Sequence, residues 1–253
     1  MEILQIPVLK DNYVYLLHEP ASGATAAVDP AVAEPVLEAL AARGWRLTHI
    51  LNTHPHGDHV DGNWTLKRET GCRVLGAEQD RDRIPGLDVG LGEGDEVALG
   101  AARAQVLSVP GHTAGHLAYW FPEQAALFPG DTLFALGCGR LLGGTAEQLW
   151  QSLDRLRQLP PATRIYCAHE YTQANGRFAR TVEPDNPALA ARLAQVDELR
   201  RQGQPTVPST LAEELATNPF LRPESPEIRR RLGLEAAPPE VVFAALRRRK
   251  DIF

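Results

Sequence analysis

Hydrophobic and polar positions alternate along the first part of the chain in a way that predicts a β-rich fold. Short apolar or alternating runs are typical of strands. They occur at residues 3–8, 13–17, 24–28, 47–51, 104–109, 117–121, 125–128 and 164–168. Three helices are expected between them, at residues 32–43, 60–69 and 145–158. Gly44 would end the first helix, and Thr145 with Gln148 would form a capping box for the third. This mixture predicts an α/β architecture.

The pattern changes in the last third of the chain, where no strand is predicted after Pro187. Leu189, Leu193, Val196 and Leu199 follow helical spacing. Further helices are expected at residues 209–216, 226–232 and 239–249, separated by prolines. We therefore predict two domains, an α/β metal-binding domain over residues 1–169 and an all-helical domain over residues 170–253.

Composition and charge narrow the classes of function. The chain has 253 residues, 43% of them hydrophobic and 23% charged, so it is not a disordered chain. No apolar run approaches the roughly 18 residues of a membrane span. The net charge of −6 argues against a nucleic-acid partner. With 3 scattered cysteines and no secretory signal, we expect a cytoplasmic protein. We also expect a monomer without a membrane partner.

Four of the strongest candidate ligands lie within six residues. These are His54, His56, Asp58 and His59, in a chain with only 8 histidines. The segment fits no strand or helix pattern, so we place it on a loop. Alternate residues of an extended segment point to the same side, so His54 and His56 can bind one ion. Asp58 and His59 would then face a second position. A solvated polar loop is the alternative reading of this segment.

Three further candidates each follow a predicted strand, namely His112, Asp131 and His169. Taken alone, His112 would be a surface histidine and Asp131 a turn residue. Together with the first cluster they make seven ligands, too many for one tetrahedral ion. They fit two ions bridged by the Asp131 carboxylate. Imidazole and carboxylate suit Zn²⁺, Fe or Mn. We expect two divalent ions per chain, with Zn²⁺ the first choice.

Several motifs resemble known families. The runs His54-x-His56-x-Asp58-His59, Gly111–His116 and Gly130–Phe134 resemble the metallo-β-lactamase superfamily. Narrower motifs resemble glyoxalase II, the hydroxyacylglutathione hydrolase family. These are Cys138–Arg140, Gly144–Thr145, Ala168–Thr172, Pro205–Leu211, Asn218–Arg222 and Arg247–Asp251. The resemblance covers essentially the whole chain. It implies an αββα sandwich with an all-helical C-terminal domain that binds the glutathione substrate.

The resemblance also implies an activity and site residues. The reaction would be hydrolysis of S-(2-hydroxyacyl)glutathione, typically S-D-lactoylglutathione, by a hydroxide bound to two metal ions, as in methylglyoxal degradation. Asp58 would orient that hydroxide. The substrate-binding positions would be Arg140, Tyr171, Arg247 and Lys250. Without the resemblance, Arg247 and Lys250 would be a solvated helix end whose charge suits the helix dipole.

Two departures from the family pattern and three other functions stay open. Leu142 stands where the family usually has an aromatic residue and Asp61 where glycine is common, so the acyl-group preference and the metal identity are undecided. The alternatives are a glutathione-persulfide dioxygenase with one iron, a nuclease or lactonase of the same superfamily, and a non-catalytic binding module. The acidic first part argues against a nuclease, and a closed metal site would be expected of a purely structural protein.

Overall fold

The computed structural model describes residues Met1–Phe253 and divides them into two compact units. The first unit contains residues 1–108 and 115–130. The second contains residues 109–114 and 131–253. Residues 131–169 therefore fold with the helical last third of the chain. No helix is both long enough and apolar enough to cross a membrane.

A six-stranded sheet in the first unit runs in the order β1-β2-β3-β4-β5-β6. Its strands are β1 (Glu2–Val8), β2 (Asn12–Glu19), β3 (Ala24–Val28), β4 (His49–Leu51), β5 (Arg73–Ala77) and β6 (Val89–Leu91). The first three strands pair antiparallel, and β3 to β6 pair parallel. The predicted strand at residues 24–28 is confirmed, whereas β5 was not predicted.

Helices connect the parallel strands, as parallel pairing requires. Helix α1 (Glu34–Arg43) ends at Gly44, as predicted, and Gly44 has a left-handed conformation with a φ of 65°. Its buried Val36 and Leu40 join the core formed with the sheet. The single helix predicted at residues 60–69 was wrong in part. The structure has two helices, α2 (Gly57–Val60) and α3 (Asn63–Thr70), so residues 57–59 are helical and not part of the predicted loop.

Four more strands of the first unit pair antiparallel in the order β10-β9-β8-β7. They are β7 (Glu96–Leu99), β8 (Ala102–Ser108), β9 (Leu117–Phe121) and β10 (Ala126–Phe128). Tyr15 of β2 and Phe128 of β10 meet edge to face, with ring centroids 5.5 Å apart. Both side chains are buried, so the two groups of strands pack face to face.

The second unit contains two pairs of very short strands and six α-helices. The strand pairs are β11 (Leu133–Phe134) with β12 (Gly137–Cys138), and β13 (Arg164–Ile165) with β14 (Ser209–Thr210). The helices are α4 (Ala146–Leu156), α5 (Thr172–Val182), α6 (Pro187–Arg201), α7 (Leu211–Thr217), α8 (Pro226–Leu232) and α9 (Pro239–Asp251). Strand β14 contradicts the prediction of no strand after Pro187, and α5 was not predicted.

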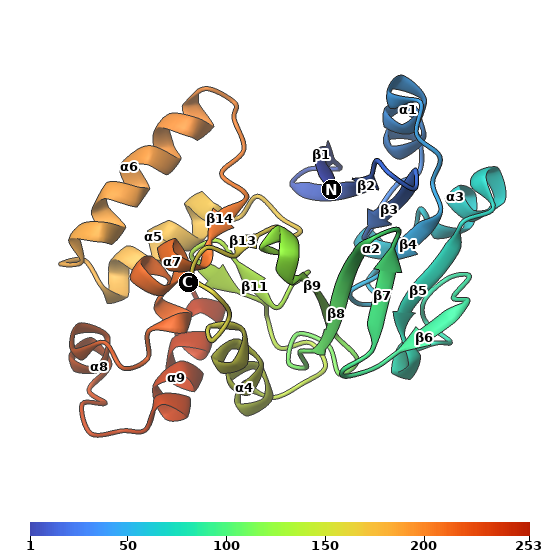
Figure 1. The fold of residues 1–253 in the computed structure, drawn as a ribbon. Coiled ribbons are helices and arrows are strands. Elements are labelled where there is room, and N and C mark those ends of the chain that lie inside the picture. Colours follow the sequence, from blue (N-terminus) through green and yellow to red (C-terminus); the bar gives the residue numbers. More distant parts are fainter. The chain divides into compact units, whose positions relative to one another are not determined.

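The helices of the second unit pack in pairs, with α4 beside α9 and α5 beside α6 (Figure 1). The predicted capping box of α4 is present, because Thr145 and Gln148 exchange side-chain and backbone hydrogen bonds. Trp150 of α4 and Phe243 of α9 lie with ring centroids 5.6 Å apart. Leu136 of the β11–β12 hairpin is fully buried against α5 and α6. The hairpin and the helices thus share one core.

Candidate metal centre

The segment after β4 brings two histidine side chains together. His54 Nε2 lies 3.0 Å from His56 Nδ1, and the His54 side chain is fully buried. This confirms the prediction that the alternating histidines face one side. Two imidazole nitrogens at this distance need a shared proton or a shared cation between their lone pairs. The pair therefore fits a metal ion of the kind that imidazole prefers.

The first turn of α2 carries a second pair of candidate ligands. His59 Nε2 lies 3.6 Å from Asp58 Oδ2. The His59 side chain is 1% exposed, whereas the Asp58 side chain is 43% exposed. The carboxylate can therefore reach both a bound ion and a solvent molecule. Its partial exposure also suits the role that the sequence assigns to Asp58.

Sequence reasoning missed Asp29, which orients His59. Asp29 directly follows β3, has a φ of 49° and is buried. Its carboxylate accepts hydrogen bonds from the backbone N–H of Thr53 at 2.7 Å and the Thr53 hydroxyl at 2.6 Å. It also lies 3.1 Å from His59 Nδ1. A proton held on Nδ1 by Asp29 leaves Nε2 as the ligand atom.

Asn12, at the start of β2, was also missed. Its side-chain amide donates to the Asp58 backbone oxygen and to Asp58 Oδ2, both at 3.1 Å. These two hydrogen bonds fix the backbone of α2 at Asp58 and the rotamer of the Asp58 carboxylate. Asn12 itself is 93% buried, so its amide is held in place by packing. No local pattern in the sequence could have paired residues 46 positions apart.

The second unit places its three candidate ligands side by side. Asp131 Oδ2 lies 3.5 Å from His112 Nε2, and Asp131 Oδ1 lies 3.4 Å from His169 Nε2. The three side chains are nearly buried. One carboxylate thus directs one oxygen toward each of two imidazoles. This is the arrangement expected of a carboxylate that bridges two ions, each of which also binds one histidine.

Neighbouring groups fix these histidines. His112 Nδ1 lies 2.8 Å from the Arg140 backbone oxygen, which leaves Nε2 facing Asp131. The Tyr171 ring stacks on His169 with centroids 4.6 Å apart and an interplanar angle of 5°. Gly139 is required here, because a Cβ atom would lie 2.1 Å from the Asp131 backbone oxygen. A side chain at position 139 would displace the Asp131 backbone.

The candidate substrate-binding cations differ in their surroundings. The Arg140 side chain is exposed, whereas Arg247 is 98% buried. The Arg247 guanidinium donates to the backbone oxygens of Cys138 at 3.0 Å and Gly139 at 3.3 Å. Burial, followed by the nearby guanidinium groups, lowers the pKa of the Lys250 ammonium from its ordinary value. Lys250 also lies 5.3 Å from the centre of the Phe178 ring.

The cysteines have no activated thiol among them. Cys72, Cys138 and Cys167 are all buried, and none forms a disulfide. Burial raises the pKa of all three thiols, that of Cys167 to about 12. We expect Ellman's reagent at pH 8 to label none of the 3 thiols in the native protein and all of them in denaturant. Rapid labelling of a native thiol would contradict the assignment of these residues to packing.

Two family models match adjacent parts of the chain. The model of the metallo-β-lactamase superfamily matches residues 13–169, and the model of the hydroxyacylglutathione hydrolase C-terminus matches residues 170–253. The crystal structure of ETHE1 from Myxococcus xanthus is similar, with a TM-score of 0.69 and 28% identity, covering 100% of this chain and 99% of that one. The di-iron-bound form of TTHA1623 has a TM-score of 0.63 and 27% identity, covering 87% and 100%. The fold is therefore the metallo-β-lactamase fold, with a helical C-terminal segment.

Full-length relatives narrow the class further. The hydroxyacylglutathione hydrolase of Methylococcus capsulatus is 70% identical over 253 residues, which are 100% of this chain and 99% of the relative. That of Rhodospirillum rubrum is 53% identical with the same coverage. This chain belongs to the hydroxyacylglutathione hydrolase family. The resemblance to glyoxalase II inferred from the motifs is thus confirmed.

Proposed function

We propose that this chain hydrolyses the thioester bond of S-(2-hydroxyacyl)glutathione, typically S-D-lactoylglutathione, to give glutathione and a 2-hydroxy acid. The observation that carries the proposal is the relation to hydroxyacylglutathione hydrolases over the full length of the chain. The helical residues 170–253 match the C-terminal model of that family, and we assign substrate binding to them. Degradation of methylglyoxal is the corresponding role.

We propose seven metal ligands for this chain. The set is His54, His56, Asp58, His59, His112, Asp131 and His169. Its support is the pairing within the first unit and the placement of Asp131 between two imidazoles in the second. The related TTHA1623 was solved in a di-iron-bound form. For this chain we propose two divalent ions, with Zn²⁺ the first choice for imidazole and carboxylate ligands.

The mechanism follows from what the side chains can do. When bound, two metal ions would lower the pKa of a water molecule to roughly 7 and polarise the thioester carbonyl. Asp58 accepts a hydrogen bond from the attacking water and orients it toward the carbonyl carbon. Asn12 holds the Asp58 carboxylate in that direction. The leaving thiolate has a conjugate-acid pKa of about 8.5, so the site needs no dedicated general acid.

Glutathione has two carboxylates, and we assign basic and hydroxyl groups of the second unit to them. Arg140 and Lys250 supply cations, and Tyr171 supplies a hydroxyl group. Arg247 belongs to the same set in a supporting role, because its guanidinium holds the backbone next to Arg140. Leu142 is 63% exposed and stands where the family usually has an aromatic residue, so we expect one wall of the pocket for the thiol part of the substrate to lack an aromatic face.

Replacing Lys250 with methionine is expected to raise KM for S-D-lactoylglutathione roughly tenfold and to leave kcat almost unchanged. The reason is that a charged hydrogen bond to a carboxylate contributes about 1.5–3 kcal/mol to binding in both the ground and transition states. Arg249→Met is the matched control, because it removes the same charge from an exposed neighbour. An equal rise in KM in both variants would show a general charge effect instead.

The same lysine predicts a pH dependence of binding. The protonated ammonium binds the carboxylate, and burial lowers its pKa from the ordinary value of 10.5. Raising the pH through this lowered pKa removes the cation, so KM should rise in alkaline solution before an exposed lysine would titrate. Steady-state kinetics between pH 7 and pH 10 measure this rise. Its persistence in Lys250→Met would assign the titration to another group.

A comparison of two thioesters tests whether the chain recognises glutathione. Thiol release is measured from S-D-lactoylglutathione and from S-D-lactoyl-N-acetylcysteamine, which lacks both carboxylates. We expect kcat/KM to be at least roughly 100-fold higher for the glutathione thioester, since two charged contacts are lost with the other. Equal values for the two thioesters would contradict recognition of the tripeptide.

A further inference from the structure

The β11–β12 hairpin lies in the sequence between the ligand Asp131 and the substrate-binding Arg140. It contains two strands of two residues each, joined by Ala135 and Leu136. Leu136 has a φ of 59°, a left-handed conformation that is unfavourable for leucine. A hairpin this short does not hold its shape by its own hydrogen bonds. Its conformation must therefore be imposed by its surroundings.

Side chains from the helical segment satisfy the outward backbone groups of this hairpin. Asn218 donates to the oxygens of Phe134 at 3.1 Å and Gly137 at 3.0 Å. Asn175 donates to the Ala135 oxygen at 3.1 Å. The Arg247 guanidinium likewise donates to the backbone oxygens of Cys138 and Gly139. These three donors are nearly or fully buried, so water does not replace them.

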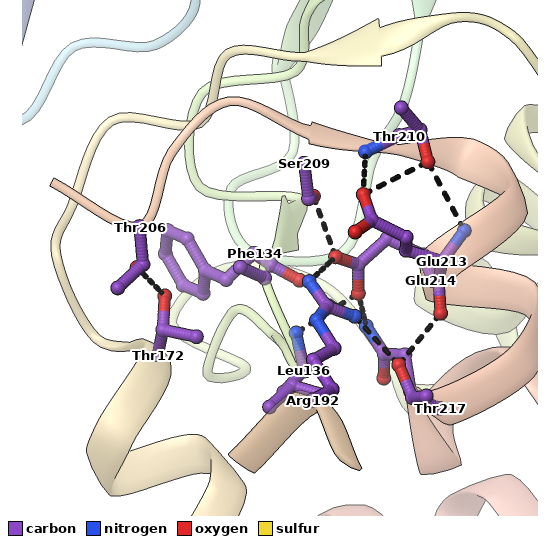
Figure 2. A network of polar contacts seen from close by, with 12 residues as sticks. Phe134, Leu136, Thr172, Arg192, Thr206, Ser209, Thr210, Glu213, Glu214 and Thr217 are labelled. Carbon is purple, nitrogen blue, oxygen red and sulfur yellow. Dashed lines mark hydrogen bonds and ion pairs between the residues drawn. The ribbon is translucent and has the colours of Figure 1, made fainter. Parts of the chain in front are cut away.

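Glu214 on α7 supplies the remaining contact and is the centre of the network. Its Oε2 accepts from the backbone N–H of Leu136 at 2.9 Å and from Asn218 at 3.0 Å. Its Oε1 accepts from Ser209 at 2.6 Å and from the Arg192 guanidinium (Figure 2). Glu214 is fully buried. A buried carboxylate is stable only with such a complete set of donors, so its geometry is rigid.

The hairpin transmits this geometry to two metal ligands. The Gly139 N–H donates to the Thr132 oxygen at 3.4 Å, next to Asp131, and the Arg140 oxygen lies 2.8 Å from His112 Nδ1. Gly139 also packs against the Asp131 backbone and the His112 side chain too closely to admit a Cβ atom. A shift of the hairpin would therefore change the distances from Asp131 to His112 and His169.

We propose that Glu214 is a positioning residue for the metal centre, acting with Asn175, Asn218 and Arg247 through the hairpin. The helical segment would then serve two purposes, because it builds the support of Asp131 as well as binding substrate. This inference rests on the proposed function, since it assumes that Asp131 and His112 bind metal.

The chain offers a matched control for Glu214, namely Glu183. Both glutamates are buried, and each accepts from an arginine, from a serine hydroxyl at 2.6 Å and from an asparagine amide. Only Glu214 also accepts from the hairpin. In Glu214→Gln, an amide N–H₂ replaces one carboxylate oxygen and must face the two donors from which that oxygen accepted hydrogen bonds. Glu183→Gln creates the same conflict away from the hairpin.

The test measures metal retention and stability separately. Each variant is loaded with Zn²⁺, challenged with increasing concentrations of a chelator and analysed for bound metal. Thermal unfolding of the metal-free protein is measured in parallel. We expect Glu214→Gln to lose metal at a roughly tenfold lower chelator concentration than wild type, as for other partners that orient ligands. Glu183→Gln should retain metal like wild type, with a similar fall in the Tm of the metal-free form.

Equal metal retention in wild type and both variants would overturn the inference but leave the proposed function intact. A wild-type chain that retains no metal would overturn both. Asn175→Asp is the second variant, for the case that Glu214→Gln does not fold, because it places a carboxylate against the Ala135 oxygen from a different helix. It should weaken metal retention in the same way, and unchanged retention in a folded Asn175→Asp protein would likewise overturn the inference.

Discussion

Asp58→Asn is expected to lower kcat for S-D-lactoylglutathione by roughly 10²- to 10⁴-fold, the usual effect of losing a group that accepts a proton or hydrogen bond from the attacking water. An amide is a weaker acceptor than a carboxylate and can turn an N–H₂ group toward the water. In the wild type, the Asn12 amide donates to Asp58 Oδ2 at 3.1 Å. In Asp58→Asn, this donor favours the rotamer of the new asparagine that directs its amide oxygen at Asn12. Steady-state kinetics at saturating metal measure the effect.

Asp61→Asn is the control for this variant. Asp61 is an exposed carboxylate three residues further along the same segment. It carries the same charge, but no role in orienting water is assigned to it. We expect its kcat to stay within a few-fold of wild type. Full activity of Asp58→Asn with both metals bound would remove Asp58 from the mechanism.

Asp131→Asn should reduce the metal content from two ions to one or fewer per chain and abolish most of the activity. One oxygen of the Asp131 carboxylate lies 3.5 Å from His112 Nε2, and the other lies 3.4 Å from His169 Nε2. An amide has a single oxygen and cannot serve two cations. Because both ions contribute to the hydrolytic step, we expect kcat to fall at least roughly 10³-fold. Elemental analysis of the purified variant gives the metal content.

Asp80→Asn provides the matched control for a buried aspartate. Asp80 is 96% buried and is not one of the proposed metal ligands. Its carboxylate accepts a hydrogen bond from the Arg83 guanidinium at 3.0 Å. It is expected to cost stability without changing the metal content. Two ions in purified Asp131→Asn would contradict the bridging role of Asp131.

Local sequence patterns predicted those elements whose cause is local. The strands at residues 24–28 and 117–121 and the capped start of α4 are confirmed. Strand β14 was missed because it has two residues, and its partners in β13 lie 46 and 44 positions earlier in the chain. Helix α5 was missed because Gly176 interrupts its apolar pattern. That glycine is explained by packing, since a Cβ atom there would lie 2.3 Å from Leu193.

The candidate ligands could be predicted because their residue types are rare and concentrated. The residues that hold them could not be predicted. Asp29 and Asn12 occur where aspartate and asparagine commonly form turns, so their long-range bonds to Thr53 and Asp58 left no local signal. Without the family resemblance, Arg247 is one of four successive cations at a helix end. Only the packing of α9 distinguishes it from its exposed neighbours.

The most direct test of the account follows thiol release from S-D-lactoylglutathione, oxygen uptake and metal content in one sample of the protein. The account predicts that thiol release rises with bound metal up to two ions per chain and that no oxygen is consumed. A sample that holds two ions per chain and releases no thiol would contradict it, as would oxygen consumption by a protein with a single iron.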